Sequence, residues 1–373
     1  TVKAYWSTVV QLLPPHDKGV IDRVMSVEDI ERVPFDEALE DGRIEICQEE
    51  IDPAFISAVL EQSSPGPREL QVVYSPLHGV GATAVVPVLD QAGFEDVEIF
   101  GPHKNPDGDF PNVPGNVSNP ENPEVFESIV AHASKAGADL AVASDPDCDR
   151  IGCSAPLTQS EGAPWDILTG NQIGALLADY VLETWQAAGR LTPQHFIIET
   201  LVTTELTRRI GDSYGVRTVG DLLVGFKWIA EVVDREGPEL FVYGTEESHG
   251  YVAGTHVRDK DGAVASLLLC ELAAKLKADG QTLHQKLDAL MWQHGAHAER
   301  TISVQMPGSE GMQRMQEVMA RFRTEPPTSV GGINVAQCRD YLENTITTAA
   351  GETKPLPKPH GDLIMLDLAT DGN

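Results

Sequence analysis

The sequence is short of cysteine, of positive charge and of long apolar runs. Its five cysteines are scattered, and no two of them form a Cys-x-x-Cys pair: they are Cys47, Cys148, Cys153, Cys270 and Cys338. Scattered single cysteines are typical of free thiols in a reducing compartment, so we expect a cytoplasmic protein. No apolar run reaches the length of a membrane span, and we expect no membrane partner.

The deficit of positive charge is large. The chain has 27 lysines and arginines against 57 aspartates and glutamates, which gives a formal net charge of −30. A surface this acidic repels nucleic acid and anionic membranes, and we expect neither as a partner. A ligand that carries phosphate would need a site that is locally basic within this repulsive field.

What the sequence does contain fits a globular protein of several domains. Its 373 residues are 41% hydrophobic and 23% charged, and this length suits two to four domains. The chain begins at Thr1 without a methionine and ends on Asp371-Gly372-Asn373, soon after the strand-like residues 363–368. Asp-Gly after a strand predicts a hairpin, yet no returning strand follows. We therefore expect an interior part of a longer protein.

The strongest motif is Ser144-Asp145-Pro146-Asp147-Cys148-Asp149-Arg150, with an aspartate at every second position. It follows the apolar residues 138–143, which predict a buried strand. Because Pro146 continues neither a helix nor a sheet ladder, we expect a tight loop at the C-terminal end of that strand. Open α/β sheets bind ligands at this edge, and clustered carboxylates suit Mg²⁺ or Ca²⁺.

Two other interpretations of this acidic loop were open. An EF-hand loop also begins with alternating aspartates, but it needs glycine at its sixth position and glutamate at its twelfth. This chain has Arg150 and Pro156 there, which excludes an EF-hand. A solvated acidic turn that caps a helix stays possible, since turns favour aspartate and proline. Arg150 favours the metal site, because a cation beside metal-bound carboxylates suits an anionic ligand such as phosphate.

Strands and helices alternate around this loop. The first unit predicts a mainly parallel sheet covered by helices, with strands at 70–74, 96–100 and 138–143 and helices at 82–92 and 125–136. The second unit repeats the pattern, with helices from 170 and at 203–210 and 263–277, Asp261 as the N-cap of the last, and strands at 196–198, 216–219 and 239–243. From residue 299 the pattern predicts an α+β domain, with strands at 301–304, 333–336 and 363–368 and a core-facing helix stripe at Met312, Met315, Met319 and Phe322.

A second polar loop lies at Gly244 to Gly250, again after a predicted strand. Its acids, hydroxyls and histidine suit the vicinal hydroxyls of a sugar, and the alternative is an ordinary polar turn. Arg258 and Lys260 stand just before a predicted helix start and suit a phosphate, although a surface ion-pair cluster would look the same. Gly225-Phe226-Lys227 adds another lysine in a loop after a strand.

Together these loops resemble the α-D-phosphohexomutase superfamily, which includes phosphoglucomutase and phosphomannomutase. Residues 145–150 are similar to its metal loop, with Cys148 where glycine or alanine is usual, and Glu246-Glu247-Ser248 is similar to its sugar loop. The resemblance covers nearly the whole chain and implies consecutive α/β domains with mixed or parallel sheets, followed by a truncated α+β domain. The implied domains are the end of domain 1 (1–66), domain 2 (67–167), domain 3 (168–298) and the start of domain 4 (299–373).

The resemblance also implies an activity, which is that of a phosphosugar mutase. Such an enzyme interconverts hexose 1-phosphate and hexose 6-phosphate, of glucose or mannose, through a phosphoserine and a bisphosphate intermediate. It would be a monomer or homodimer that uses one Mg²⁺ per chain and a sugar bisphosphate as activator. The implied site is Asp145, Asp147 and Asp149 for the metal, Arg150 and Lys260 for catalysis, and Glu246, Ser248, Gly225, Lys227, Arg258 and His249 for the sugar phosphate.

Two signatures of the superfamily are absent from these 373 residues. No Thr-Ala-Ser-His-Asn-Pro type loop is present to supply the phosphoserine, and no Ser-Gly-Thr type loop is present to grip the substrate phosphate. Val224, before Gly225, also replaces the usual threonine. We expect this chain to be inactive alone. Phosphopentomutase, sugar-bisphosphate synthase and a non-catalytic sugar-phosphate-binding protein remain alternatives.

Overall fold

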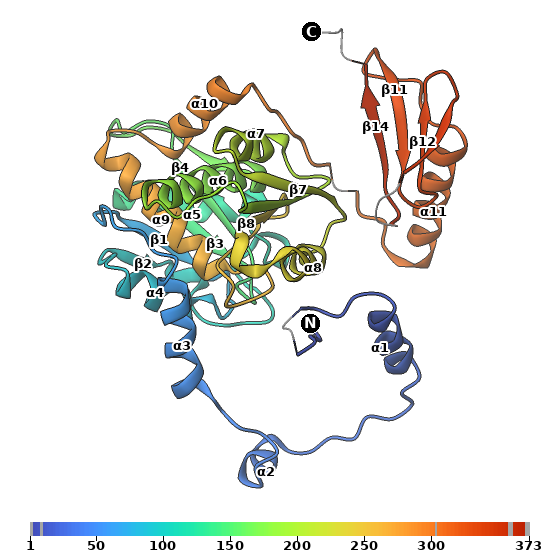
Figure 1. The fold of residues 1–373 in the computed structure, drawn as a ribbon. Helices are drawn as coiled ribbons and strands as arrows, with labels where there is room; N and C mark the ends of the chain where they lie inside the picture. The colour runs from blue at the N-terminus through green and yellow to red at the C-terminus, as the bar shows by residue number, and fades with distance from the viewer. Residues whose placement is uncertain (1–2, 8–9, 303, 357–360, 370–373) are drawn as a thin grey trace. The chain divides into compact units, whose positions relative to one another are not determined.

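The computed structural model describes residues 3–7, 10–302, 304–356 and 361–369 (Figure 1). The chain divides into two compact units. The first contains residues up to 220 together with 224–297, and the second contains 221–223 and the residues from 298 onwards. The Asp371-Gly372 hairpin signal lies outside the described residues.

The first sheet of the first unit is mixed. Its strand order is β2-β1-β3-β4-β5, and its strands are β1 (Val72–Ser75), β2 (Val97–Ile99), β3 (Leu140–Ser144), β4 (Ile151–Pro156) and β5 (Trp165–Leu168). β1 pairs in parallel with β2 and β3, as the alternation of strands and helices predicted. β4 and β5 add an antiparallel edge that the sequence reading missed. The α/β fold class is confirmed.

Short helices connect these strands. They are the 3-10 turns η1 (Gly81–Thr83), η2 (Gly101–His103), η3 (Pro114–Asn116) and η4 (Pro123–Val125), and the α-helices α4 (Val85–Gln91) and α5 (Phe126–Ala136). α5 buries Phe126, Ile129 and Ala133 against one face of the sheet. It ends at Gly137, whose φ of 76° is the left-handed conformation that glycine adopts without cost.

The second sheet has the order β7-β6-β8-β9. Its strands are β6 (Phe196–Thr200), β7 (Arg217–Leu222), β8 (Phe241–Glu246) and β9 (Gly250–Ala253). β6 and β8 are parallel, whereas β8 and β9 form an antiparallel hairpin. Its helices are α6 (Gly170–Ala187), α7 (Glu205–Ser213), α8 (Phe226–Glu236), η5 (Pro238–Leu240), α9 (Gly262–Ala278) and α10 (Leu283–His294).

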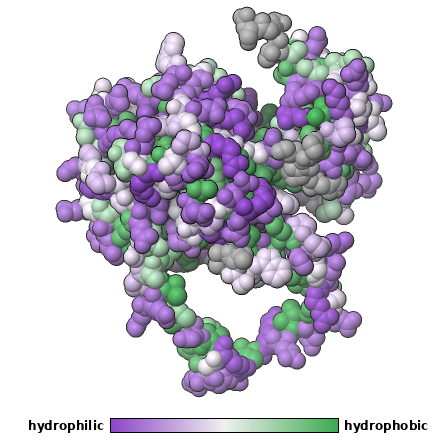
Figure 2. Space-filling model, viewed as in Figure 1, coloured by the Kyte–Doolittle hydropathy of each residue, from purple (hydrophilic) through white to green (hydrophobic). Residues whose placement is uncertain are grey.

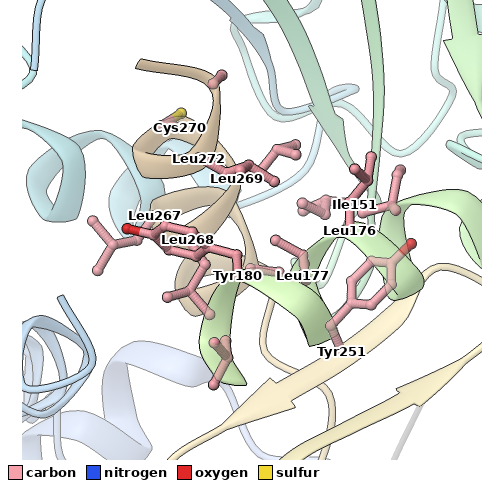
Figure 3. Close-up of a cluster of buried hydrophobic side chains, with 14 of the residues drawn as sticks. Ile151, Leu176, Leu177, Tyr180, Tyr251, Leu267, Leu268, Leu269, Cys270 and Leu272 are labelled. Carbon is pink, nitrogen blue, oxygen red and sulfur yellow. The ribbon is translucent and has the colours of Figure 1, made fainter. Parts of the chain in front are cut away.

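α6 and α9 carry the largest part of the core, between the two sheets. Figure 3 shows Leu176, Leu177 and Tyr180 of α6 facing Leu268 and Leu269 of α9, with strand residues Ile151 and Tyr251 nearby. All are buried, and burying one such leucine stabilises the fold by about 1.5–3 kcal/mol. The predicted N-cap of α9 is confirmed, since Asp261 Oδ1 accepts hydrogen bonds from the amides of Ala263 and Val264.

A buried carboxylate fixes the segment that joins α3 (Gln48–Leu60) to β1. The Glu271 side chain on α9 is fully buried, and it accepts a hydrogen bond from the Ser64 amide at 3.1 Å. It also accepts from Ser63 Oγ at 2.5 Å, Arg68 Nη2 at 2.7 Å and Tyr180 Oη at 2.9 Å. Four donors suit an acceptor-only group, so residues 63–67 form a fixed connection.

The N-terminal helices are far less buried. α1 (His16–Met25) buries no residue and α2 (Phe35–Glu40) only Ala38, whereas α3 places Ile56 and Val59 in the core. Met25 is 80% exposed and Ile30 69% exposed. Figure 2 shows apolar side chains at the surface along this segment. A hairpin stands before α1, in which the Trp6 and Leu12 amides donate to the carbonyls of Val10 and Ala4.

The second unit pairs α11 (Gly308–Thr324) with an antiparallel sheet. The strands are β10 (Ser329–Val330), β11 (Ile333–Asp340), β12 (Thr345–Thr348), β13 (Thr353–Pro355) and β14 (Ile364–Leu368). Two predictions are wrong here. Residues 301, 302 and 304 are irregular, because an alternating tetrapeptide needs a partner strand to become a sheet. Met312 and Met315 are more than half exposed, so the stripe identified an apolar face but not a core.

Within the described residues, no helix is long and apolar enough to cross a membrane.

Candidate functional site

The acidic loop at residues 145–150 is held in shape by its own backbone. The Asp145 side chain is buried, and its Oδ1 accepts hydrogen bonds from the amides of Asp149 and Arg150, both at 3.0 Å. Cys148 takes a left-handed conformation with φ of 58°, which glycine adopts more readily than any residue with a side chain. The loop therefore follows β3 as a tight turn, as predicted.

The three aspartates converge. One carboxylate oxygen from each of Asp145, Asp147 and Asp149 lies within 4.8 Å of the others. Burial, and then the charge of Asp149, raise the pKa of Asp145 to about 6 against the opposing effect of Arg150. Such crowding of oxygen ligands is relieved by a hard divalent cation, so the donor set fits Mg²⁺.

Arg150 is the anchor of this cluster. Its Nε donates to Asp145 Oδ2 at 2.9 Å, and its Nη1 donates to Glu121 Oε1 at 2.7 Å. Burial opposes the charged form of Arg150, but the carboxylate of Asp145 outweighs it and raises the pKa. Sequence reasoning missed Glu121, which lies in the long loop before α5 and carries no local signal of its partner.

Two glycines, Gly79 and Gly262, pack closely against the backbone of the acidic loop. A Cβ on Gly79 would lie 2.2 Å from Pro146 Cα, and one on Gly262 would lie 2.5 Å from the Cys148 carbonyl oxygen. The Val80 amide donates to the Pro146 carbonyl, and the Gly262 amide donates to the Cys148 carbonyl. The loop's position thus depends on close backbone contacts that only glycine permits.

The second polar loop is a three-residue turn, Glu247 to His249, between β8 and β9. Ser248 and Glu247 are half-buried in it. Glu246, at the end of β8, is buried, and its Oε1 accepts a hydrogen bond from the Gly225 amide at 2.5 Å. Two of the expected sugar-binding residues, Gly225 and Glu246, are thereby brought together.

His249 is buried and neutral. Its burial, and then the charge of Arg150, lower its pKa to about 4, so it carries no charge at neutral pH. Its Nδ1 is a buried atom without a hydrogen-bond partner among the described residues. A buried polar atom of this kind costs stability unless a ligand satisfies it.

The two loops are bonded to each other. The Ile151 amide donates to the His249 carbonyl at 3.2 Å, and Arg150 and Gly250 form an antiparallel bridge. The acidic loop and the sugar-like turn are therefore joined through their backbones, although they belong to different sheets.

The expected basic residues divide into two groups. Lys260 Nζ lies 3.2 Å from Asp149 Oδ2, so this lysine joins the acidic cluster. A pocket of about 220 Å³ is lined by Asp147, Asp149 and Lys260 among others. Arg258 instead donates to Asp234 and to the Thr255 carbonyl, and Lys227 pairs with Asp17 at 3.1 Å.

Burial of Glu246 gives a prediction for stability against pH. Burial raises the pKa of Glu246 from its ordinary value near 4.5 to about 7, against the Gly225 amide and Lys260. The folded chain thus binds this proton more tightly than the unfolded chain, and the resulting stability is present below about pH 4.5 and lost as pH rises through about 7. Between these values the wild type should lose up to about 3 kcal/mol relative to Glu246→Gln.

Urea unfolding from pH 4.5 to 8 measures this difference. The exposed Glu239→Gln change serves as the control and should run parallel to the wild type. A Glu246→Gln profile that also runs parallel would show that Glu246 titrates normally.

Comparison with known proteins identifies the family of this chain. The family model "Phosphoglucomutase/phosphomannomutase, alpha/beta/alpha domain II" matches residues 53–157, and the corresponding domain III model matches residues 169–294. The chain belongs to the α-D-phosphohexomutase superfamily. The resemblance carried by the acidic loop and the sugar loop is confirmed.

Phosphohexomutase relatives extend beyond this chain. The phosphoglucomutases of Staphylococcus aureus strains N315 and MSSA476 are each 32% identical over 280 residues, which are 74% of this chain and 49% of the relative. A phosphoglucomutase/phosphomannomutase family structure from Burkholderia thailandensis is similar in fold, with a TM-score of 0.54 and 16% identity over 80% of this chain and 58% of that one. The chain spans about half the length of the curated relatives it matches.

Proposed function

We propose that this chain forms the metal- and sugar-binding part of a phosphosugar mutase that interconverts hexose 1-phosphate and hexose 6-phosphate. The observation that carries the proposal is the bonding of the acidic loop to the sugar-like turn through Ile151 and His249. This arrangement holds a cation site and a set of hydroxyl-binding groups at a fixed separation, as phosphoryl transfer to a sugar requires.

Asp145, Asp147 and Asp149 would hold one Mg²⁺ in this proposal. When bound, the metal supplies positive charge that stabilises the oxygens of a phosphoryl group in transfer. Arg150 adds a fixed guanidinium beside the same position, held by Asp145. Its Nη1, which donates to Glu121, is the donor that a phosphate oxygen would take over.

Glu246 and Ser248 would bind hydroxyls next to the reacting hydroxyl of the sugar. His249, neutral at pH 7, would offer a hydrogen bond rather than a charge. Lys260, whose Nζ lies 3.2 Å from Asp149, would contact a phosphate or move a proton, and Gly225, Lys227 and Arg258 would complete the substrate contacts.

The phosphoryl donor in this proposal is a phosphoserine outside these 373 residues, since the sequence has no loop of that type. The phosphoserine passes its phosphoryl group to the sugar phosphate, and the bisphosphate then returns the other phosphoryl group to the serine. A sugar bisphosphate would thus act as activator. A cytoplasmic location and a monomeric or homodimeric state belong to the same proposal.

The test is an assay of glucose 1-phosphate conversion to glucose 6-phosphate, with Mg²⁺ and glucose 1,6-bisphosphate, on the protein that carries this chain. Conversion is expected, and Asp147→Ala should lower it at least about tenfold, since changes to the outer-shell partners of metal ligands already cost about 10–100-fold and Asp147 is proposed as a direct ligand. Mannose 1-phosphate and ribose 1-phosphate in parallel identify the preferred sugar. Binding of these sugar phosphates without turnover would indicate a non-catalytic sugar-phosphate-binding protein. Full activity of Asp147→Ala would refute the metal role of Asp147.

A further inference from the structure

The ammonium group of Lys3 lies inside the acidic cluster. Lys3 Nζ is 2.6 Å from Asp149 Oδ2 and 4.0 Å from Asp147 Oδ2, and it is also 3.5 Å from Asp259 Oδ2. About three quarters of the Lys3 side chain is buried there, since 26% remains exposed. This is the position that a cation bound by the cluster would share, because two of the expected metal ligands face it.

The surrounding contacts hold Lys3 in this place. Tyr5 Oη donates to Asp259 Oδ2 at 2.6 Å, and Tyr5 pairs with Gln11 in the N-terminal hairpin. Burial of Lys3 opposes its charged form, but the hydrogen bond to Asp149 and the charges of Asp259 and Asp149 outweigh it and raise the pKa. Lys3 is therefore a permanent positive charge across the physiological pH range.

A second ion pair fixes the same segment further along. Asp17, at the start of α1, accepts a hydrogen bond from Lys227 Nζ at 3.1 Å. Lys227 is one of the cations proposed to contact the sugar phosphate. Residues 3–7 and 10–17, the N-terminal strap, thus place a positive charge on the carboxylates and a negative charge on a phosphate-binding lysine. Lys3 therefore carries the same sign of charge as the proposed metal ion, and Asp17 carries the same sign as the proposed phosphate.

We propose that the N-terminal strap is a built-in competitor of the site, in which Lys3 occupies the cation position and Asp17 occupies Lys227 until a divalent cation and a sugar phosphate displace them. This inference rests on the proposed metal role of the three aspartates. Competition follows from Coulomb's law, because Asp149 cannot give its closest contact to Lys3 and to a divalent cation at once. Binding of either ligand releases one anchor of the strap and so favours binding of the other.

Titration calorimetry with Mn²⁺ tests the proposal. Lys3→Gln removes the competing charge and should tighten Mn²⁺ binding about five- to tenfold, within the usual range of coupling between two ligands. Lys18→Gln is the matched control, because it removes one charge from an exposed position directly after the strap without touching the acidic cluster. The difference between wild type and Lys3→Gln should shrink at high salt, which screens the strap.

The outcomes separate this proposal from the proposed function. Equal Mn²⁺ affinity in wild type and Lys3→Gln, with binding lost in Asp147→Ala, would overturn the strap and leave the metal site intact. No Mn²⁺ binding in any of these proteins would overturn both. Tighter binding in Lys18→Gln as well would show a general charge effect and overturn the strap.

Hydrogen exchange gives a second measurement that does not depend on affinity. Saturating Mn²⁺ should raise the exchange of the Trp6 and Leu12 amides several-fold, because the hairpin that they close loses its Lys3 and Tyr5 anchors. Unchanged exchange at these amides with bound Mn²⁺ would overturn displacement of the strap.

Discussion

Replacing Glu271 by alanine is expected to destabilise the first unit by about 3–5 kcal/mol, the usual cost of removing one partner from a buried ion pair. The change would leave the Arg68 guanidinium, the Ser64 amide and the Tyr180 hydroxyl without their shared acceptor. Burial raises the pKa of Glu271, and the hydrogen bond from Ser63, then the charge of Arg68, act against it. Urea unfolding at pH 7, followed by circular dichroism, measures the loss.

The appropriate control removes both charged partners. Arg68→Met combined with Glu271→Leu should cost clearly less than Glu271→Ala, because no buried charge is left unpaired. If Glu271→Ala lowers the free energy of unfolding by less than about 1 kcal/mol, the four donors form hydrogen bonds to water instead. The connection between α3 and β1 would then not depend on Glu271.

Gly79→Ala is expected to lower Mn²⁺ affinity by about a hundredfold without any change to a carboxylate. The new Cβ would lie 2.2 Å from Pro146 Cα and 2.4 Å from the Pro146 carbonyl oxygen, so the acidic loop has to move. Misplacement of catalytic groups by about 1 Å costs on the order of 10²-fold in reaction rate, and we expect a loss of similar size in metal affinity when the carboxylates move. The same overpacking should also cost about 1–3 kcal/mol of stability.

Gly101→Ala is the control for this change, since a Cβ on Gly101 meets no atom within 4 Å. It should bind Mn²⁺ as the wild type does. Mn²⁺ titration of both variants, after circular dichroism has established that they are folded, gives the comparison. Wild-type Mn²⁺ affinity in Gly79→Ala would show that the acidic loop accommodates the new Cβ. The close packing at Gly79 would then not position the carboxylates.

The sequence alone was sufficient to locate the acidic loop and the sugar-like turn, because both follow apolar strands and concentrate unusual side chains within a few residues. The N-cap at Asp261 was predictable for the same reason, since a cap and its helix are neighbours in the chain. Local order of this kind is set by interactions that a short stretch of sequence contains.

The missed features depend on residues that are distant in sequence. Lys3 and Asp149 are 146 positions apart, Arg150 and Glu121 are 29 apart, and neither pair shares a pattern that could reveal it. The antiparallel strands β4 and β5 were missed because the parallel strands that precede them in the sequence do not determine the direction of strands at the sheet edge. The Met312 and Met315 stripe failed in a related way, since periodicity shows which face of a helix is apolar and not what covers it.

The bridge between Arg150 and Gly250 also constrains how the length of this chain can change. An insertion in residues 145–150 or 247–249 would shift the backbone on both sides of the bridge, and therefore both loops at once. Residues 158–162, between β4 and β5, are exposed and carry no such tie to the site. We therefore expect the hairpin between β4 and β5 to tolerate insertions such as reporters and affinity tags. The two site loops, in contrast, have to keep their exact number of residues.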